Sequence, residues 1–202
     1  MSFYALIPFA ITIVVVLIVM SIVNWITNKK IDKNLLAVAA LTKGEYSKEH
    51  DTATLTGVYK NKNYKVSVKY RGIGKNKILY YHISLEDVSN VRFLCVKSYA
   101  KSRLESQVNQ MTKVLSEDDE FDSVNTVFTD NPTLTEHLLA NTSFLSALKE
   151  IMQKYSEISI KKDITLLKRY HVTLTEVDVL LSTLDKLILL TTCLENLTLE
   201  KV

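Results

Sequence analysis

The sequence predicts an α+β protein: an N-terminal transmembrane helix, an antiparallel sheet of short strands packed with helices, and a long C-terminal helix. Three observations predict this fold class. Residues 3–26 form an uncharged apolar stretch, FYALIPFAITIVVVLIVMSIVNWI. Segments dense in Val, Ile, Tyr and Leu follow between residues 55 and 96, as is typical of strands. Residues 177–194 then carry an apolar stripe with helical periodicity.

The apolar stretch predicts a membrane anchor that is retained in the mature chain. At about 1.5 Å rise per residue it spans roughly 36 Å, more than a hydrocarbon core of about 30 Å. A cleaved signal peptide would have a basic start and small residues at its cleavage site, but this stretch ends in Ser21, Asn24 and Trp25. A buried core helix fits less well, because the run Ile11–Val16 has no polar face.

The ends of this stretch predict its orientation. Tyr4 and Trp25 are the aromatic residues expected at the two membrane–water interfaces. Lys29, Lys30 and Lys33 follow the stretch, whereas no basic residue precedes it. The positive-inside rule therefore predicts a single-pass protein of the cell membrane, with its N-terminus outside and its C-terminal domain in the cytoplasm.

We divide the chain into a transmembrane anchor (1–28), a juxtamembrane helix (29–44) and a cytoplasmic α+β domain (45–202). The juxtamembrane segment is helical in composition and has Gly44 at a plausible C′ position. It either extends the anchor or lies separately at the interface. Residues 45–54 are interpreted as a polar connection. The two cysteines, Cys95 and Cys193, lie in apolar segments and suggest buried thiols, although a single disulfide between them stays open.

Four strands are predicted after this connection, at residues 55–60, 64–71, 78–85 and 91–96. Gly72 and Gly74 fit a hairpin turn between the second and third of these strands. They do not form a dinucleotide fingerprint, because no third glycine and no helix follow. Residues 99–115 are ambiguous, with a partial helical stripe in a polar segment.

Five acidic residues lie between Glu117 and Asp122. Clustered carboxylates suit calcium or magnesium, but the segment lacks the glycine and spaced ligands of an EF-hand loop. A solvated acidic turn, with Phe121 anchored on the core, is the competing interpretation. Residues 123–129 are then predicted to form a strand.

The remaining elements are mostly helical. Asn131 and Pro132 predict a helix start, and the stripe that follows to residue 154 is divided near Asn141. A hairpin is predicted over residues 156–170. Thr173 and Glu176 have capping-box spacing and predict the start of the long C-terminal helix, which ends near residue 196.

Charge is distributed unevenly along the chain. Residues 29–77 carry a net charge of +8, whereas the rest carries −5. The basic part is the part nearest the predicted anchor, so an anionic inner leaflet would attract it. Lipid contact and an ordinary solvated face both remain open for this basic patch, which comprises Lys60, Lys62, Lys65, Lys69, Arg71, Lys75 and Lys77.

No catalytic constellation is evident in the sequence. The four histidines, His50, His82, His137 and His171, include no pair at helical spacing for a zinc site. No P-loop or GxSxG motif occurs. We therefore predict a non-enzymatic protein with no catalytic residues, metal, cofactor or small-molecule substrate. An enzyme whose site assembles from distant residues remains the weaker alternative. Nucleic-acid binding is not expected, because no nucleic-acid motif accompanies the basic stretch.

The favoured hypothesis is an accessory or scaffold subunit of a membrane protein complex, which contacts other integral membrane subunits. Ser21 and Asn24 are the candidate contact residues, since polar side chains can bond across helices in lipid. The main alternative is a module that binds an anionic lipid surface through the basic patch.

An acidic turn leads here into a strand and then into a helix start that contains proline; the residues concerned are Asp119, Phe121, Asp122, Val127, Phe128, Asp130, Asn131 and Pro132. This order of parts resembles that of uncharacterised prokaryotic single-pass membrane-anchored proteins with a cytoplasmic α+β domain. The resemblance covers about residues 50–155 and implies the architecture only, because no activity accompanies it.

Overall fold

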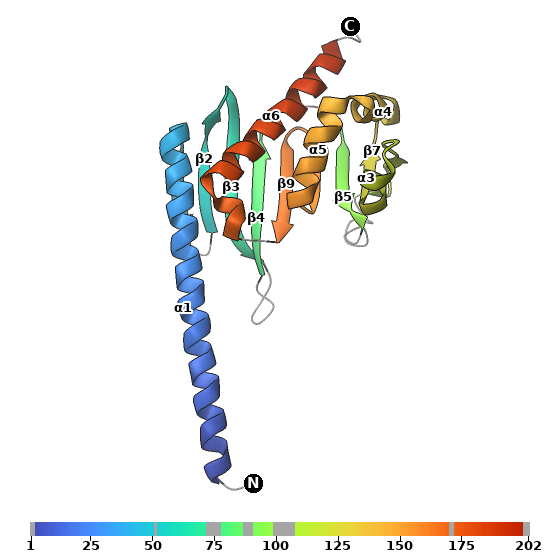
Figure 1. Ribbon diagram of the computed structural model, residues 1–202. Helices are drawn as coiled ribbons and strands as arrows, with labels where there is room; N and C mark the ends of the chain where they lie inside the picture. Colours follow the sequence, from blue (N-terminus) through green and yellow to red (C-terminus); the bar gives the residue numbers. More distant parts are fainter. Residues whose placement is uncertain are drawn as a thin grey trace.

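The computed structural model describes residues 3–50, 52–71, 78–86, 91–98, 108–169 and 172–199 (Figure 1). It confirms the predicted α+β class. A long apolar N-terminal helix precedes an antiparallel nine-stranded sheet with further helices, and a long C-terminal helix ends the described chain.

The first half of the chain supplies the long helix and most of the sheet. Its elements are α1 (Phe3–Thr42), β1 (Glu45–Glu49), β2 (Thr52–Tyr59), β3 (Lys62–Arg71), β4 (Ile78–Leu85) and β5 (Phe93–Lys97). The second half alternates between helices and shorter strands. Its elements are β6 (Thr112–Val114), α3 (Asp119–Val124), β7 (Asn125–Thr129), α4 (Pro132–Ala140), α5 (Thr142–Lys154), β8 (Glu157–Ile160), β9 (Ile164–Arg169), the 3-10 helix η3 (Val172–Thr175) and α6 (Val177–Leu199).

The sheet has the strand order β1-β2-β3-β4-β9-β8-β5-β7-β6, and every neighbouring pair is antiparallel. The register places one side chain from each strand in a single transverse row. That row is Tyr46, Leu55, Val66, Ile83, Leu166, Ile158, Cys95, Val127 and Val114. Eight of these nine side chains are buried, so the row forms the floor of the core beneath α5 and α6 (Figure 1).

Helix α1 belongs to two environments. Its side chains from Ile11 to Ile26 are exposed, whereas Ile31, Leu35 and Val38 are at most 2% exposed. The predicted anchor and juxtamembrane helix therefore lie in one continuous helix. We call residues 11–26 the apolar half of α1, and residues 31–42 together with the described chain after them the body.

Helix α1 ends in a Schellman motif, but with a different residue at C′ than expected. Lys43 takes the left-handed conformation (φ 51°), and the Gly44 amide donates to the Ala39 carbonyl at 2.9 Å. The prediction of Gly44 at C′ was therefore wrong by one position. Glycine is needed at position 44 for space, because a Cβ there would lie 2.6 Å from the Thr56 carbonyl oxygen.

Substituting Gly44→Ala is expected to destabilise the protein by about 1–3 kcal/mol, as overpacking does in well-packed cores. The added methyl group would meet backbone, which cannot move aside as a flexible side chain can. Denaturant unfolding of the full chain in detergent micelles measures the change. Lys43→Gly is the matched control and should be neutral or stabilising, because glycine adopts positive φ without strain. Equal stability of Gly44→Ala and the parent chain would contradict the prediction.

The interpretation of residues 45–54 as a connection was wrong. They contain β1, which pairs with β2 from Glu45↔Thr56 to Glu49↔Thr52. Strand β1 lies at the sheet edge and is mostly exposed, so it needs few apolar residues to be stable there.

Several predicted boundaries can be compared with the structure. Asn131 caps α4 and Pro132 is its first residue, as predicted, and Asn141 separates α4 from α5.

The predicted capping box at 173–176 was wrong as a helix start, because η3 occupies this segment and α6 begins at Val177. Residues 123–124 belong to α3 and not to the predicted strand. In the ambiguous stretch, residues 112–114 form β6 and residues 99–107 lie outside the described chain.

Candidate membrane and partner-binding surfaces

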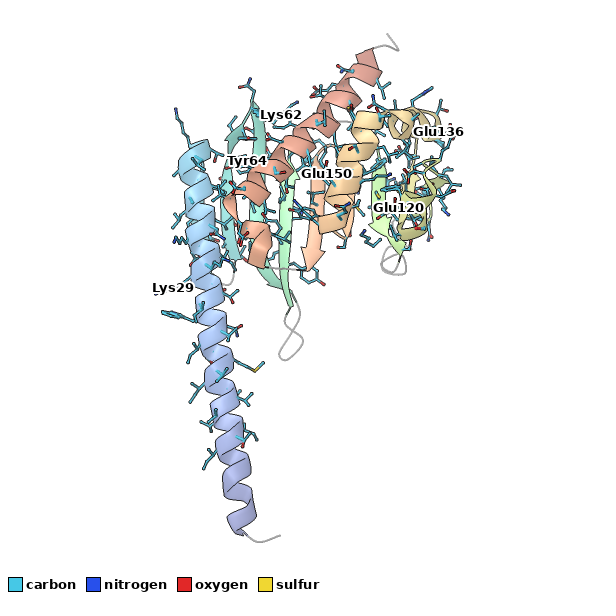
Figure 2. The ribbon with its side chains drawn as sticks, in the orientation of Figure 1. Lys29, Lys62, Tyr64, Glu120, Glu136 and Glu150 are labelled. Carbon is cyan, nitrogen blue, oxygen red and sulfur yellow. The ribbon has the colours of Figure 1, made fainter. Side chains whose placement is uncertain are left out.

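The apolar half of α1 is the largest exposed apolar surface in the described chain. It exposes large apolar side chains by 45–60% on all sides of the helix (Figure 2). Soluble monomers rarely expose contiguous apolar patches of this extent. Within the described residues, this helix alone is long and apolar enough to cross a membrane. The residues concerned are Ile11, Ile13, Val14, Val15, Val16, Leu17, Ile18, Val19, Met20, Ile22, Val23, Trp25 and Ile26.

Polar and aromatic residues mark the end of this surface nearest the body. Ser21 and Asn24 are exposed, and Trp25 is 58% exposed. The Lys29 ammonium group lies 4.0 Å from the centre of the Trp25 ring, a cation–π contact that keeps both groups at one level of the helix. Lys33 is exposed on the next turn. The side chain of the other predicted interface residue, Tyr4, lies outside the described part.

A set of polar contacts fixes α1 to the body, starting one residue beyond the Trp25–Lys29 contact. Lys30 forms an ion pair with Glu176 at 3.2 Å, and the Asn34 amide donates to the Thr175 hydroxyl at 3.1 Å. On another side of the helix, Asp32 accepts hydrogen bonds from the Tyr46 hydroxyl (2.7 Å) and from Lys48 (2.6 and 2.9 Å). Partial burial and the bond to Asp32 raise the pKa of Tyr46, so this hydroxyl stays a proton donor.

The far end of α1 is fixed by a buried pair of hydroxyl groups. The Thr42 hydroxyl donates to the Val38 carbonyl oxygen at 2.8 Å, which uses its one proton. Tyr64 must therefore donate to Thr42 across 2.5 Å. Both residues are at most 9% exposed. Contacts near both ends of residues 31–42 of α1 therefore hold this segment alongside β1–β3.

These contacts also show which residues of β3 lie at the same level as which residues of α1. From Thr42 to Asp32 the helix rises about 15 Å, and from Tyr64 to Lys69 strand β3 rises about 17 Å. Lys69 pairs with Thr52, which pairs with Glu49, next to the Lys48–Asp32 ion pair. Strand β3 thus runs along α1, and its last residue, Arg71, lies past the level of Asp32, toward the apolar half of α1.

The structure divides the predicted basic patch between two ends of the body. Lys60 pairs with Asp185 and Lys62 pairs with Glu195, each at 2.7 Å, so acids of α6 neutralise these two residues. Figure 2 shows Lys62 at the end of the body away from Lys29. Lys65 is exposed mid-strand, and Lys69 is half-buried near the end closer to the apolar half of α1. The Arg71 side chain and residues 75 and 77 lie outside the described part.

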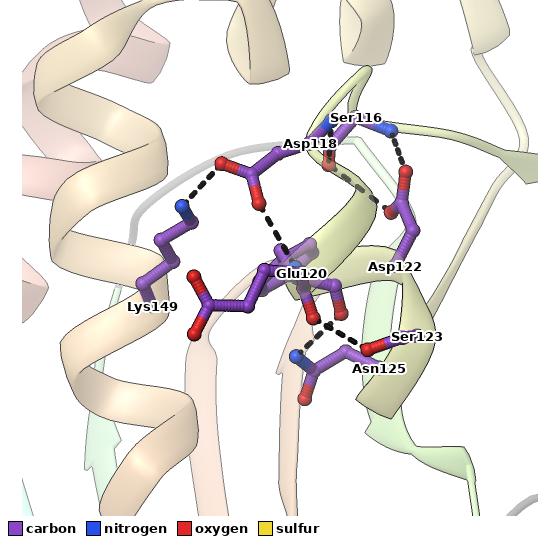
Figure 3. Close-up of polar contacts among 8 residues, drawn as sticks. Ser116, Asp118, Glu120, Asp122, Ser123, Asn125 and Lys149 are labelled. Atoms are coloured by element: carbon purple, nitrogen blue, oxygen red, sulfur yellow. Dashed lines mark hydrogen bonds and ion pairs between the residues drawn. The ribbon is translucent and has the colours of Figure 1, made fainter.

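The acidic segment forms a capped turn (Figure 3). Asp118 accepts a hydrogen bond from the Phe121 amide at 2.9 Å, which caps α3, and also pairs with Lys149 of α5. Asp122 accepts from the amide (2.9 Å) and the hydroxyl (3.1 Å) of Ser116. Phe121 is 3% exposed and anchors the turn on the core, as predicted. Two of the five carboxylates are therefore engaged in the fold.

Replacing Asp118 by asparagine should cost stability near neutral pH but not in acid. The ion pair with Lys149 and the Phe121 amide hold the pKa of Asp118 below its usual value. A carboxylate with a depressed folded pKa adds stability above its unfolded pKa, and that stability is lost as pH falls through the folded pKa. Asparagine keeps the cap but removes the charge.

Urea unfolding of Asp118→Asn and the parent chain, from neutral pH to about pH 3, measures this effect. The stability gap between them should close as pH falls. Asp119→Asn, on the same helix but exposed, is the control and should show a much smaller gap. A pH-independent gap for Asp118→Asn would contradict the ion-pair explanation.

The described surface includes two small hollows. One of about 170 Å³ lies between α3 and α5 and is lined in part by Lys97, Glu120, Asn125 and Lys149. Asn125 is 4% exposed; its amide donates to the Phe121 carbonyl, and its side-chain oxygen has no hydrogen-bond partner in the described chain. Sequence reasoning missed Asn125, which has no motif around it. The other hollow, of about 240 Å³, lies beside Arg92 and Met111.

The residue types most often used in catalysis are dispersed. His50 is exposed in the turn after β1, and His137 is exposed on α4. His82 is half-buried on β4, and His171 lies outside the described part. Within the residues that the structure describes, no three His, Cys, Asp or Glu side chains are grouped to hold a metal ion. Cys95 and Cys193 are free thiols, and burial raises the pKa of both, which keeps them protonated at neutral pH.

Comparison with known proteins identified no similar protein. The chain matches no protein-family model, no curated protein and no solved structure.

Proposed function

We propose that this protein is a non-enzymatic accessory or scaffold subunit of a membrane protein complex. Its apolar half of α1 would lie in the bilayer as a single-pass anchor. Its body would lie on the cytoplasmic side, with the N-terminus outside. Lys29, Lys30 and Lys33, which follow the apolar half, support this orientation by the positive-inside rule.

One observation carries this proposal. A single helix joins an exposed apolar segment to the core of a folded body, without a linker between them. Leu35 and Val38 are buried in the body, and Lys30 and Asp32 form ion pairs with it. The position of the apolar half of α1 is therefore rigidly coupled to that of the sheet. A rigid connection of this kind suits a subunit that positions a partner or holds a complex together.

Co-purification from native membranes tests the proposal. The full-length tagged chain is solubilised in a mild detergent, and the proteins eluting with it are identified. We expect a stable complex with at least one other integral membrane protein. The variant Ser21→Leu/Asn24→Leu should stay in the membrane but lose this partner, because hydrogen-bonding groups in lipid have been removed. Elution of the parent chain alone, in a detergent that preserves other complexes of the same membrane, would reject the proposal.

Anionic-lipid binding is a second candidate function, favoured by the end of β3. Lys69 and the backbone of Arg71 lie near the level of residues 28–32 of α1, where headgroups would be. Nanodiscs that contain the full chain, with either anionic or zwitterionic lipid, test this contact. A salt-sensitive increase in protection of Lys69 from amine labelling in anionic discs would support it. Equal labelling in both lipids would reject it.

A further inference from the structure

Ser21 and Asn24, two polar residues in the part of the apolar half of α1 nearest the body, lie on the same face of the helix as the residues buried in the body. Together, these polar and buried residues are spaced alternately three and four positions apart, so they form one stripe along the helix. The stripe comprises Ser21, Asn24, Asn28, Ile31, Leu35, Val38 and Thr42.

Exposure along this stripe changes at one level. Thr42, Val38, Leu35 and Ile31 are at most 9% exposed because the body covers them. Asn28 is half-buried, and below it Asn24 and Ser21 are exposed. The stripe therefore continues the interface between α1 and the body past the lower edge of the body (Figure 1).

From this continuity we propose that a transmembrane helix of a different membrane protein packs against Ser21 and Asn24, directly beneath the body. This inference rests on the proposed function and adds the face of α1 that meets the partner. The partner helix would carry a hydrogen-bonding side chain opposite Asn24, which lies about 9 Å along the helix from Lys30. An amide at that depth gains more from a protein partner than from hydrocarbon.

The body excludes a second copy of α1 from this position. Packed helices lie about 8–10 Å apart. Two straight copies of α1 that met at Ser21 and Asn24 would run side by side up to Thr42. Each would then enter the space that the body of the other copy fills beside Ile31, Leu35 and Val38. The occupant must therefore end near the level of Asn28, as a transmembrane helix of another chain can.

The opposite face of α1 is different in character. Leu36, Ala37, Ala40 and Leu41 are exposed there, alongside the body. In the apolar half, residues two positions from the stripe are turned by about 200° around the helix. Val19 and Ile26 are thus the matched positions on the opposite face, at nearly the same depths as Ser21 and Asn24.

Site-specific photo-crosslinking in native membranes tests the proposal. A photoreactive amino acid replaces residue 21, 24, 19 or 26 of the full chain, one at a time. The readout is the adduct with the partner identified by co-purification, which carries its own tag. We expect adducts from positions 21 and 24 and little from positions 19 and 26. In parallel, Asn24→Leu should weaken the complex by roughly threefold to thirtyfold, whereas Ile26→Leu should not.

Other outcomes overturn the inference in distinguishable ways. Adducts with the partner from positions 19 and 26 only, or equally from all four, would refute the assigned face while leaving the proposed function intact. An adduct of two copies of this chain from positions 21 and 24 would show self-association and refute the exclusion of a second copy. No adduct from any position, in membranes where the partner still co-purifies, would place the contact outside this helix. Absence of both adduct and co-purification would reject the proposed function as well.

Discussion

Replacing Val15 and Val19 by aspartate is expected to release the chain from the membrane. Both residues lie near the centre of the apolar stretch and are about half exposed. An aspartate at the centre of a membrane helix costs about 2.5–3.5 kcal/mol, so the pair costs about 5–7 kcal/mol. The measurement is the fraction of chain that remains with the membrane pellet after alkaline carbonate extraction.

The control for this experiment lies on the same helix. Leu36→Asp/Leu41→Asp also replaces two exposed apolar residues of α1, but in the part that runs alongside the body. We expect this variant to remain in the pellet like the parent chain. Full retention of Val15→Asp/Val19→Asp would contradict membrane insertion of the apolar half, and release of both variants would show a nonspecific effect on the helix.

Replacing Leu35 by alanine is expected to destabilise the body by about 2–5 kcal/mol. Leu35 is fully buried between α1 and the sheet, so the shorter side chain leaves a cavity that neighbouring groups fill only in part. Denaturant unfolding of the full chain in detergent micelles, followed by near-ultraviolet circular dichroism, measures the loss.

The adjacent residue supplies a close control. Leu36 has the same side chain but is 51% exposed on the outer face of the helix. Leu36→Ala should change stability by no more than about 0.5 kcal/mol. Similar small effects at both positions would contradict the conclusion that α1 is part of the core, and the rigid connection on which the proposed function depends would be lost.

Local signals in the sequence predicted much of the architecture. The apolar stretch, the strand predicted at residues 64–71, the cap at Asn131 and the helix break near Asn141 each depend on residues close together in the chain. The structure has the corresponding helix, strand and helix starts. Where a local signal was absent the prediction failed, as for β1, whose exposed edge needs no apolar alternation.

Features that depend on contacts between residues far apart in the chain could not be predicted from the sequence. The β8–β9 pair inserts between β4 and β5, a strand order that no local pattern encodes. Lys60 and Lys62 belonged to the predicted basic patch, but their charges are paired with Asp185 and Glu195 more than 120 residues away. By contrast, the stripe that links Ser21 and Asn24 to Leu35 could have been found from its alternating spacing alone.

The central claim, a membrane helix with its body on the cytoplasmic side, is tested most directly by labelling a surface thiol in intact cells. Lys65→Cys places a thiol at an exposed position of β3, in a Cys193→Ser background that removes the partly exposed native cysteine. A membrane-impermeant maleimide should label this variant only after the cells are opened. Labelling in intact cells, equal to that in opened cells, would contradict the claim.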